Sequence, residues 1–398
     1  MSKTLSRRRL LTRIGILGCS AAASPLMTPI SFAATRSDAR VVVIILRGAM
    51  DGLDVVRPYG DREFAAVRPG GRDGIELDGF YALHPDLGPL HPLWQSGELA
   101  FAHAVSTPYR DRRSHFDGQD LLEAGTADMS RDGWLNRALA HLPGAVAETA
   151  YAIGREDMRV LQGATPFASW APDADLTVSQ ATLDLVQLVS REDPLFTAAV
   201  RDAIRLSKIE TVAAQVAQNE ELDMGMAEPP RGPANAHLGV AQFAAQKLRA
   251  DARIAAFSLG GWDTHAVQDR SIRRPLNALS DTILTLRDGL GPDWSKTAVV
   301  AMTEFGRTVR QNGTAGTDHG TAGAMVLAGG ALRGGQVSAD WPGLAEVDLY
   351  DRVDLKPTRD VRAIAGWVLR DLLGLSASVI ERDVFPGVEL GANPGLIL

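Results

Sequence analysis

Short runs of apolar residues alternate with helical patterns along most of the chain. The first run, VVVIIL at 41–46, is a continuous β-branched stretch typical of a strand buried on both faces of a mostly parallel sheet. Further runs lie at 99–105, 253–259, 297–302 and 324–328. Helical periodicity is found at roughly 86–96, 114–124, 236–250, 271–289 and 358–374. This alternation predicts an α/β fold, a three-layer sandwich with a mostly parallel central sheet.

A different pattern occupies the middle of the chain. Residues 181–222 are polar, with apolar positions at helical spacing and few strand formers, and the breaker EPPRGP follows at 228–233. We therefore expect a helical cap insertion at 172–235, within one α/β domain that spans 40–398.

The first 33 residues have the features of an export signal. Arginines at 7–9 precede an apolar stretch at 14–27, and SFA at 31–33 offers a small-x-small cleavage site. This pattern predicts a twin-arginine signal peptide at 1–33 and a periplasmic or secreted protein that uses the Tat export machinery. A membrane anchor and a lipid anchor on Cys19 are the alternatives. The apolar stretch falls short of the roughly 20 residues that span a bilayer, which favours cleavage.

Composition and charge exclude some classes of partner. The chain of 398 residues is 45% hydrophobic and 22% charged, which is ordinary for a globular protein. Loss of the signal removes five positive charges and takes the formal net charge from −7 to about −12. An acidic body repels nucleic-acid phosphate, so we expect no nucleic-acid partner. Cys19 is the sole cysteine, so the mature chain has neither a disulfide nor a thiolate metal site.

Polar residues cluster where the apolar runs end. Each segment alone has an ordinary explanation, such as a turn, a solvated loop or, for Ser114, a helix N-cap. The carboxyl ends of parallel strands share one edge of a sheet, where ligands bind, so we expect one site there. Carboxylates with one or two imidazoles suit zinc, manganese, magnesium or calcium, bound as one or two ions. The polar residues in these segments are Arg47, Asp51, Arg113, Ser114, His115, Asp263, His265, Glu304, Arg307, Asp318 and His319.

The order of these segments resembles the domain-of-unknown-function 1501 family. The motifs are LRGAMDGLDVV (46–56), SHFDGQD (114–120), GGWDTH (260–265), TEFGRT (303–308) and GTDHGTAGAM (316–325). Its members are bacterial proteins, often exported by the twin-arginine pathway and assigned to the alkaline phosphatase and sulfatase-like superfamily. The resemblance covers about 40–374 and implies an alkaline phosphatase-like fold.

The resemblance also implies roles for individual residues. Ser114 matches the nucleophile at a helix start, and His115 beside it joins it as a catalytic candidate. Asp51, Asp263, His265, Glu304, Asp318 and His319 match or adjoin the superfamily's metal ligands. Arg47, Arg113 and Arg307 are candidates for binding an anionic group, because guanidinium forks match tetrahedral oxyanions. Salt bridges to neighbouring carboxylates are the alternative for Arg47 and Arg307.

Two departures from the superfamily pattern bear on the metal. Asp263 and His265 are separated by one residue, where three are usual. Phe305 stands where an imidazole ligand is usual, so the site holds one metal, or a second bound mainly by carboxylates.

These features together predict a metal-dependent hydrolase of phosphate or sulfate esters, acting on a small-molecule or glycan ester. The alternative from another class is a non-catalytic accessory protein of the cell envelope on the same fold, which the replacement at Phe305 favours. A phosphomutase is less favoured, because mutases of this superfamily act on cytosolic sugar phosphates.

Overall fold

The computed structural model of the chain describes residues 38–71, 73–110, 113–171 and 235–398. The predicted signal peptide at 1–33 lies outside the described residues, as does the predicted helical cap apart from Asn235. Both remain predictions.

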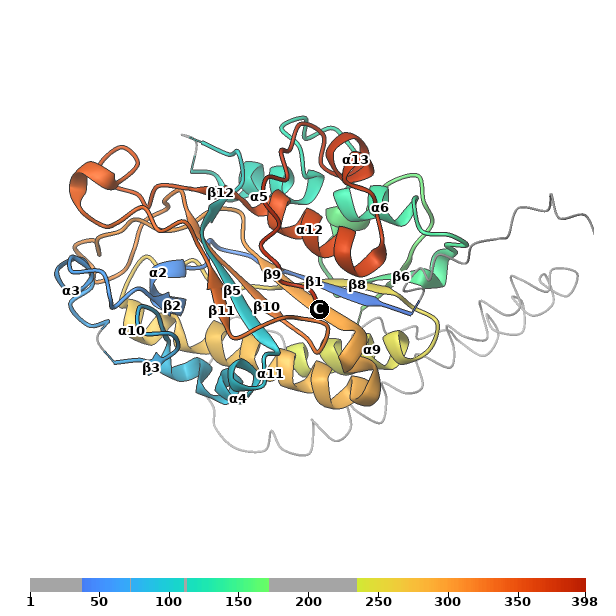
Figure 1. Cartoon of the computed structure of the whole chain (residues 1–398), viewed down its shortest axis with the longest axis horizontal. Helices are drawn as coiled ribbons and strands as arrows, with labels where there is room; N and C mark the ends of the chain where they lie inside the picture. Colours follow the sequence, from blue (N-terminus) through green and yellow to red (C-terminus); the bar gives the residue numbers. More distant parts are fainter. Residues whose placement is uncertain (1–37, 72, 111–112, 172–234) are drawn as a thin grey trace, which may run out of the picture. The chain divides into compact units, whose positions relative to one another are not determined.

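A nine-stranded sheet forms the centre of the described part of the chain (Figure 1). The strands follow the order β11 (Gln336–Ser338), β5 (Leu99–Ser106), β10 (Gly323–Ala328), β9 (Thr297–Met302), β1 (Arg40–Leu46), β8 (Ile254–Leu259), β6 (Ala150–Ile153) and β7 (Ala168–Trp170). The short β12 (Arg359–Asp360) pairs with β5. Strand β10 is antiparallel to both of its neighbours, and every other pairing in this sheet is parallel.

Strand β1 shows why the sheet is covered on both faces. All seven of its residues are buried, and successive side chains point to opposite faces because a strand has a period of two. Val41, Val43 and Ile45 belong to one hydrophobic core. Val42, Ile44 and Leu46 belong to the other. Burial of such branched side chains contributes roughly 1.5–3 kcal/mol each.

Helices cover each face of the sheet (Figure 1). The core of Val42 is closed by η1 (Pro85–Leu90), α4 (His91–Gln95), α9 (Ala236–Arg249) and α11 (Arg273–Leu290). The core of Val41 is closed by α5 (His115–Ala124), α6 (Trp134–Leu139), α12 (Val361–Leu373) and η6 (Ile380–Val384), with α13 (Ala377–Val379) beside them. The predicted three-layer α/β sandwich with a mostly parallel sheet is thus confirmed.

Shorter elements complete the described chain. A small antiparallel sheet contains β2 (Val56–Arg57), β4 (Ala82–Leu83) and β3 (Ile75–Glu76). The short helices are α2 (Gly52–Val55), α3 (Phe64–Val67), α10 (Gln268–Ser271), η2 (Ala147–Thr149), η3 (Arg159–Leu161), η4 (Gly291–Lys296) and η5 (Glu346–Asp348). None of the described helices combines the length and the apolar character needed to cross a membrane.

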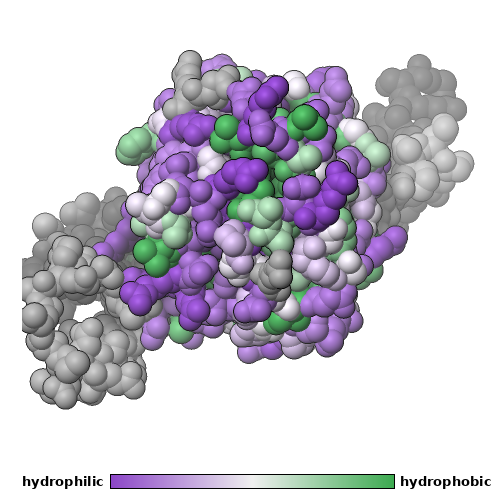
Figure 2. Space-filling model, turned by 90° about the vertical axis from the view of Figure 1, so that its left-hand side faces the viewer, coloured by the Kyte–Doolittle hydropathy of each residue, from purple (hydrophilic) through white to green (hydrophobic). Residues whose placement is uncertain are grey.

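The direction of β10 decides where the polar segments meet. The parallel strands β1, β5, β8 and β9 all end at the same edge of the sheet. Because β10 runs in the opposite direction, the segment that precedes it also lies at this edge. Figure 2 views the side on which α2, α3 and α10 lie and shows mostly hydrophilic residues, with apolar residues grouped near the middle. All five polar segments are therefore brought to the carboxyl edge of the sheet.

Candidate metal centre

Asp263, in the loop after β8, contacts all three imidazoles of the candidate site through one carboxylate oxygen. Its Oδ1 atom lies 2.9 Å from His265 Nε2 and 3.2 Å from His319 Nε2. The same oxygen lies 3.4 Å from Nε2 of His115, at the start of α5. One ligand atom each from His115, Asp263 and His319 lies within 4.8 Å of the other two. We call these four residues the histidine cluster.

The far side of each imidazole faces an oxygen that can only accept a hydrogen bond. His115 Nδ1 lies 2.8 Å from Glu304 Oε1, and His265 Nδ1 lies 3.1 Å from Asp318 Oδ1. His319 Nδ1 lies 2.8 Å from the backbone oxygen of Arg113. A neutral imidazole carries its proton on the nitrogen that donates. With the proton of each neutral ring on Nδ1, the three Nε2 atoms turn lone pairs toward Asp263.

This arrangement gathers three imidazole nitrogens around one carboxylate oxygen, to which Arg307 NH2 also donates a hydrogen bond at 2.6 Å. His265 Nε2 and His319 Nε2 are only 3.0 Å apart. His115 Nε2 is buried and makes no hydrogen bond within the described part of the chain. An unpaired buried polar atom costs about 1–3 kcal/mol. A cation among His115, Asp263 and His319 would lie against a ligand atom of each of them, so this donor set fits a metal ion.

Glu304 holds His115 in this orientation. Its side chain is fully buried, and Oε1 accepts hydrogen bonds from His115 Nδ1, from Gly48 N at 2.9 Å and from Gln119 Nε2 at 3.2 Å. Burial by itself raises the pKa of Glu304, but the hydrogen bonds from His115, from Thr303 and from the backbone outweigh it and lower the pKa. Its hydrogen bond in turn raises the pKa of His115. Glu304, predicted as a ligand, thus contacts the cluster through an imidazole.

Asp318 contacts Nδ1 of His265 as Glu304 contacts Nδ1 of His115. Its Oδ1 atom also accepts a hydrogen bond from Asn312 Nδ2 at 3.0 Å, and that bond is the largest cause of the lowered pKa of Asp318. The side chain is half-exposed. Such oxygens behind metal-binding imidazoles fix the tautomer and the ring orientation.

Asp51 lies apart from these contacts. Its carboxylate is buried, pairs with Arg68 NH1 at 2.7 Å and accepts from Gln268 Nε2 at 2.9 Å. It also caps α2 by accepting from Leu53 N at 3.1 Å. Among the described residues, its contacts are thus those of a structural ion pair and helix cap.

The predicted anion-binding arginines have internal partners. Arg47 pairs with Glu123 at 2.8 Å and with Glu156 at 2.6 Å. Arg307 is 0% exposed and donates to the backbone oxygens of four residues, Ala49, Thr317, Gly48 and Trp262, and to Asp263 Oδ1 at 2.6 Å. Arg113 is half-exposed at 52%, and its NH2 lies 3.7 Å from Asp354. Of the three, Arg113 is the one whose guanidinium remains open to solvent.

Ser114 is the N-cap of α5 and lies beside the cluster. Its hydroxyl accepts from Asp117 N at 3.4 Å, and its own N–H donates to the Tyr109 hydroxyl at 2.8 Å. It stands between Arg113, whose carbonyl contacts His319, and His115 of the cluster. The structure thus supports the N-cap and places the backbone of Ser114 directly before His115 of the cluster.

Phe305 forms an apolar wall against the imidazoles. Its ring stacks on His115 at 5.2 Å between centroids and on Tyr109 at 5.8 Å, and it is tilted against His319 at 5.1 Å. An apolar wall lowers the local dielectric and strengthens charge interactions at the cluster.

Sequence reasoning overlooked Gln119 and Asn312, and it placed His115 among catalytic residues rather than ligands. His115 and Gln119 are four residues apart in α5, so they share a helix face. This spacing is the signal in the sequence that could have indicated their shared contact with Glu304.

A search of curated proteins found no match to this chain. Among solved structures, the chain is similar to the PsFucS1 sulfatase from Pseudoalteromonas sp., at 12% identity over 92% of this chain and 74% of the other, with a TM-score of 0.39. It is similar to a protein in the alkaline phosphatase superfamily from Vibrio parahaemolyticus, at 11% identity over 88% and 71%, with a TM-score of 0.35.

A third similar structure is the C-terminal periplasmic domain of EcEptC from Escherichia coli in complex with Zn. The identity is 13% over 90% of this chain and 92% of the other, with a TM-score of 0.36. Residues 94–382 match the sequence model of the family described as "Protein of unknown function (DUF1501)". The match covers more than half of the chain, so the chain belongs to the DUF1501 family.

Proposed function

We propose that the protein is a metal-dependent hydrolase of phosphate or sulfate esters whose centre is the histidine cluster. The observation that carries the proposal is the convergence of three imidazole Nε2 atoms on Asp263 Oδ1, with an oxygen acceptor behind each ring. Three imidazoles and one carboxylate suit zinc or manganese better than magnesium or calcium, which prefer oxygen ligands.

The roles of the residues follow from their contacts. His115, Asp263, His265 and His319 would hold the ion, while Glu304 and Asp318 keep two of the imidazoles oriented. A bound divalent cation would supply Lewis acidity, which offsets charge on the ester oxygens. Phe305 and the buried side of His115 limit the access of water on one side.

Ser114 is the proposed nucleophile. A bond forms between its Oγ and the phosphorus or sulfur atom, the bond to the leaving alcohol oxygen breaks, and the serine proton is transferred to that oxygen through solvent. Water then hydrolyses the seryl ester and releases phosphate or sulfate. The half-exposed guanidinium of Arg113, next in the sequence to Ser114, would attract the anionic ester group.

A pair of variants separates the nucleophile from the helix cap. Asparagine caps a helix as well as serine does but has no hydroxyl, so Ser114→Asn keeps α5 and removes the proposed nucleophile. With zinc or manganese added, we expect wild-type protein to hydrolyse a member of a panel of phosphate monoesters, phosphate diesters and sulfate esters. Ser114→Asn should then lose at least a hundredfold in kcat at unchanged melting temperature. Full turnover by Ser114→Asn would contradict the role.

A non-catalytic accessory protein on the same fold is the second candidate. Phe305 favours it, because an aromatic ring packs against His115 and His319 where a further ligand would bind a second ion. Metal-loaded protein that turns over no ester of the panel would support this candidate against the hydrolase.

Export through the twin-arginine pathway completes the proposal and rests on the arginines at 7–9 and the apolar stretch at 14–27. A Lys-Lys replacement of Arg8 and Arg9 should hold the full chain in the cytoplasm, as fractionation would show. Unchanged export of this variant would contradict it.

A further inference from the structure

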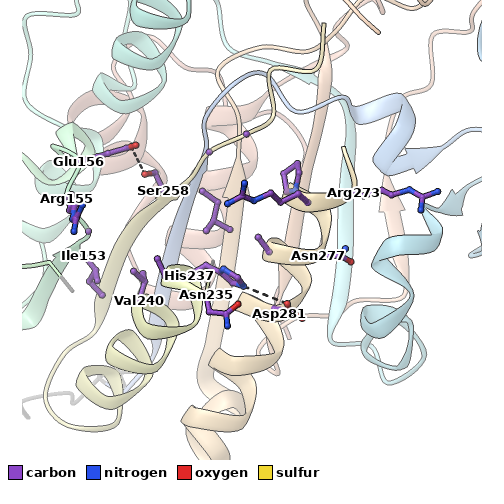
Figure 3. Close-up of a pocket in the computed structure, with 18 of the residues that line it drawn as sticks. Ile153, Arg155, Glu156, Asn235, His237, Val240, Ser258, Arg273, Asn277 and Asp281 are labelled. Atoms are coloured by element: carbon purple, nitrogen blue, oxygen red, sulfur yellow. Dashed lines mark hydrogen bonds and ion pairs between the residues drawn. The ribbon is translucent and has the colours of Figure 1, made fainter. Parts of the chain in front are cut away.

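A cavity of about 990 Å³ opens at the carboxyl ends of β6 and β8 (Figure 3). Its walls are the ends of β6 and β8, the start of α9, the end of α10 and the first half of α11, with residues from 153–156, 258–261, 235–240 and 270–281. We call it the arginine pocket. Its volume lies at the upper end of the range for small-molecule sites.

The pocket is lined by more positive than negative side chains. Arg155, Arg270, Arg273 and Arg274 line it, against Glu156 and Asp281. Both acids already face partners, as Figure 3 shows. Glu156 accepts from Ser258 Oγ at 2.6 Å, and Asp281 lies 3.7 Å from His237 Nε2.

Two of these arginines, Arg270 and Arg274, are open to a ligand, whereas Arg273 has an acidic partner. Arg273 reaches toward Asp86, at 3.8 Å. Arg270 and Arg274 are exposed and make no side-chain hydrogen bond or ion pair with any described residue. The whole chain has a formal net charge of −7, so unpaired guanidinium groups in a hollow stand out against an acidic body.

The pocket is next to the histidine cluster. Gly261 lines it and is two residues from Asp263, so their Cα atoms are at most about 8 Å apart. A chain of polar contacts also joins the two. Ser258 contacts Glu156, which contacts Arg47. Arg47 donates to Gln119, which donates to Glu304 behind His115.

We infer that the arginine pocket binds the non-reacting part of the substrate, and that this part carries at least one further sulfate or phosphate group. The inference rests on the proposed function, because the histidine cluster supplies the reaction centre. Guanidinium groups match tetrahedral oxyanions, and binding energy from remote groups of a substrate positions its reacting bond. The substrate class is therefore a polyanionic ester rather than a simple monoester.

Anion binding by full-length, chelator-treated protein tests the pocket without any reaction. The probes are sucrose octasulfate and inositol hexakisphosphate, measured by isothermal titration calorimetry at low ionic strength. We expect wild-type protein to bind at least one of them, which identifies the oxyanion. The double variant Arg270→Ala, Arg274→Ala should bind it at least tenfold more weakly.

Arg287→Ala is the matched control, because Arg287 lies in α11 with Arg274, pairs with Asp288 at 2.9 Å and does not line the pocket. Its affinity should stay within twofold of wild type, whereas Arg270→Lys, Arg274→Lys should recover part of the lost affinity by restoring charge. His265→Ala should keep the anion affinity while losing metal, so failure of the metal site and failure of the pocket are distinguishable. Wild-type protein that binds neither probe, or a double variant that binds as wild type does, would overturn the inference.

Discussion

At the scale of single residues, the candidate site is defined by the oxygens behind the imidazoles. Glu304, Asp318 and the Arg113 carbonyl each place an acceptor oxygen against an Nδ1 atom, which favours the tautomer whose Nε2 lone pair faces Asp263. Orienting groups of this kind typically change metal affinity by tenfold to a hundredfold when removed.

Replacement of Glu304 tests this orientation. Glu304→Gln keeps the volume and an acceptor but removes the charge that favours the Nδ1–H tautomer of His115. We expect zinc affinity to fall about tenfold or more, by competition with a chromogenic chelator. Asp120→Asn, a change on the same helix at a residue that pairs with Arg159, should leave the affinity unchanged. Equal affinities of the Glu304→Gln variant and the wild type would refute the orienting role.

His103, outside the site, predicts a pH dependence of stability. The ring is fully buried in β5, contacts the carbonyls of Gly52 and Val56 through Nε2 and accepts from Ala104 N through Nδ1 at 2.8 Å. Protonation would turn Nδ1 into a donor facing another donor. Burial, as the largest cause, lowers the pKa of His103 to about 4.

The direction in which stability changes with pH follows from the difference between the folded and unfolded pKa of His103. The folded state binds this proton less readily than the unfolded state, whose pKa is about 6.5. The contribution to stability is therefore complete above pH 6.5 and is lost as pH falls toward 4, by about 3 kcal/mol. Urea unfolding at pH 7 and pH 4.5 measures it. A His103→Gln variant should show a smaller loss over this range, and an identical loss would contradict the assignment.

Some residues of the site could be predicted from the sequence, whereas the partners of others could not. Asp263, His265 and His319 could be grouped because strand ends share an edge of the sheet. The partners of Asp51, Arg47 and Arg307 could not be predicted, because Arg68, Glu123 and the loop carbonyls that they contact have no periodic signal. These side chains are strongly polar, and only long-range packing decides whether they face solvent or one another.

At the scale of elements, Arg307 joins the loops at the carboxyl edge. Its guanidinium contacts carbonyls after β1 and β8 and before β10, as well as Asp263. A fully buried charge with so many acceptors has a structural role, since its removal leaves several of them unpaired.

Arg307→Met should accordingly destabilise the fold by about 3–5 kcal/mol, the usual cost of breaking a buried ion pair. Chemical unfolding of Arg307→Met beside the exposed control Arg310→Met measures the difference. A loss below about 1 kcal/mol, together with weaker binding of anions, would instead favour the anion-binding role predicted from the sequence.

The elements themselves were predictable where the patterns are long. The runs at 41–46 and 297–302 became β1 and β9, because continuous branched residues suit a strand buried on both faces. The helix expected at 86–96 divides into η1 and α4, where Pro89 and Pro92 interrupt the backbone hydrogen bonds. Strands β6, β7, β11 and β12 were not predicted, since two to four residues carry too little periodicity.

At the scale of the whole molecule, the sheet gathers the polar loops at one edge. The predicted fold class is confirmed, whereas the antiparallel direction of β10 was not predicted, because direction depends on connections rather than on local pattern. That direction brings His319 to Asp263 and completes the cluster.

Zinc titration of the double variant His265→Ala, His319→Ala tests the central claim most directly. Calorimetry on metal-free protein gives the stoichiometry, and thermal unfolding gives the stabilisation expected when an ion binds only the folded state. The exposed pair of His141 and Asp383, 3.2 Å apart, provides the control variant His141→Ala. We expect wild-type protein and His141→Ala to bind zinc and gain thermal stability, and the double variant to lose both. Unchanged zinc stoichiometry in the double variant would contradict the claim.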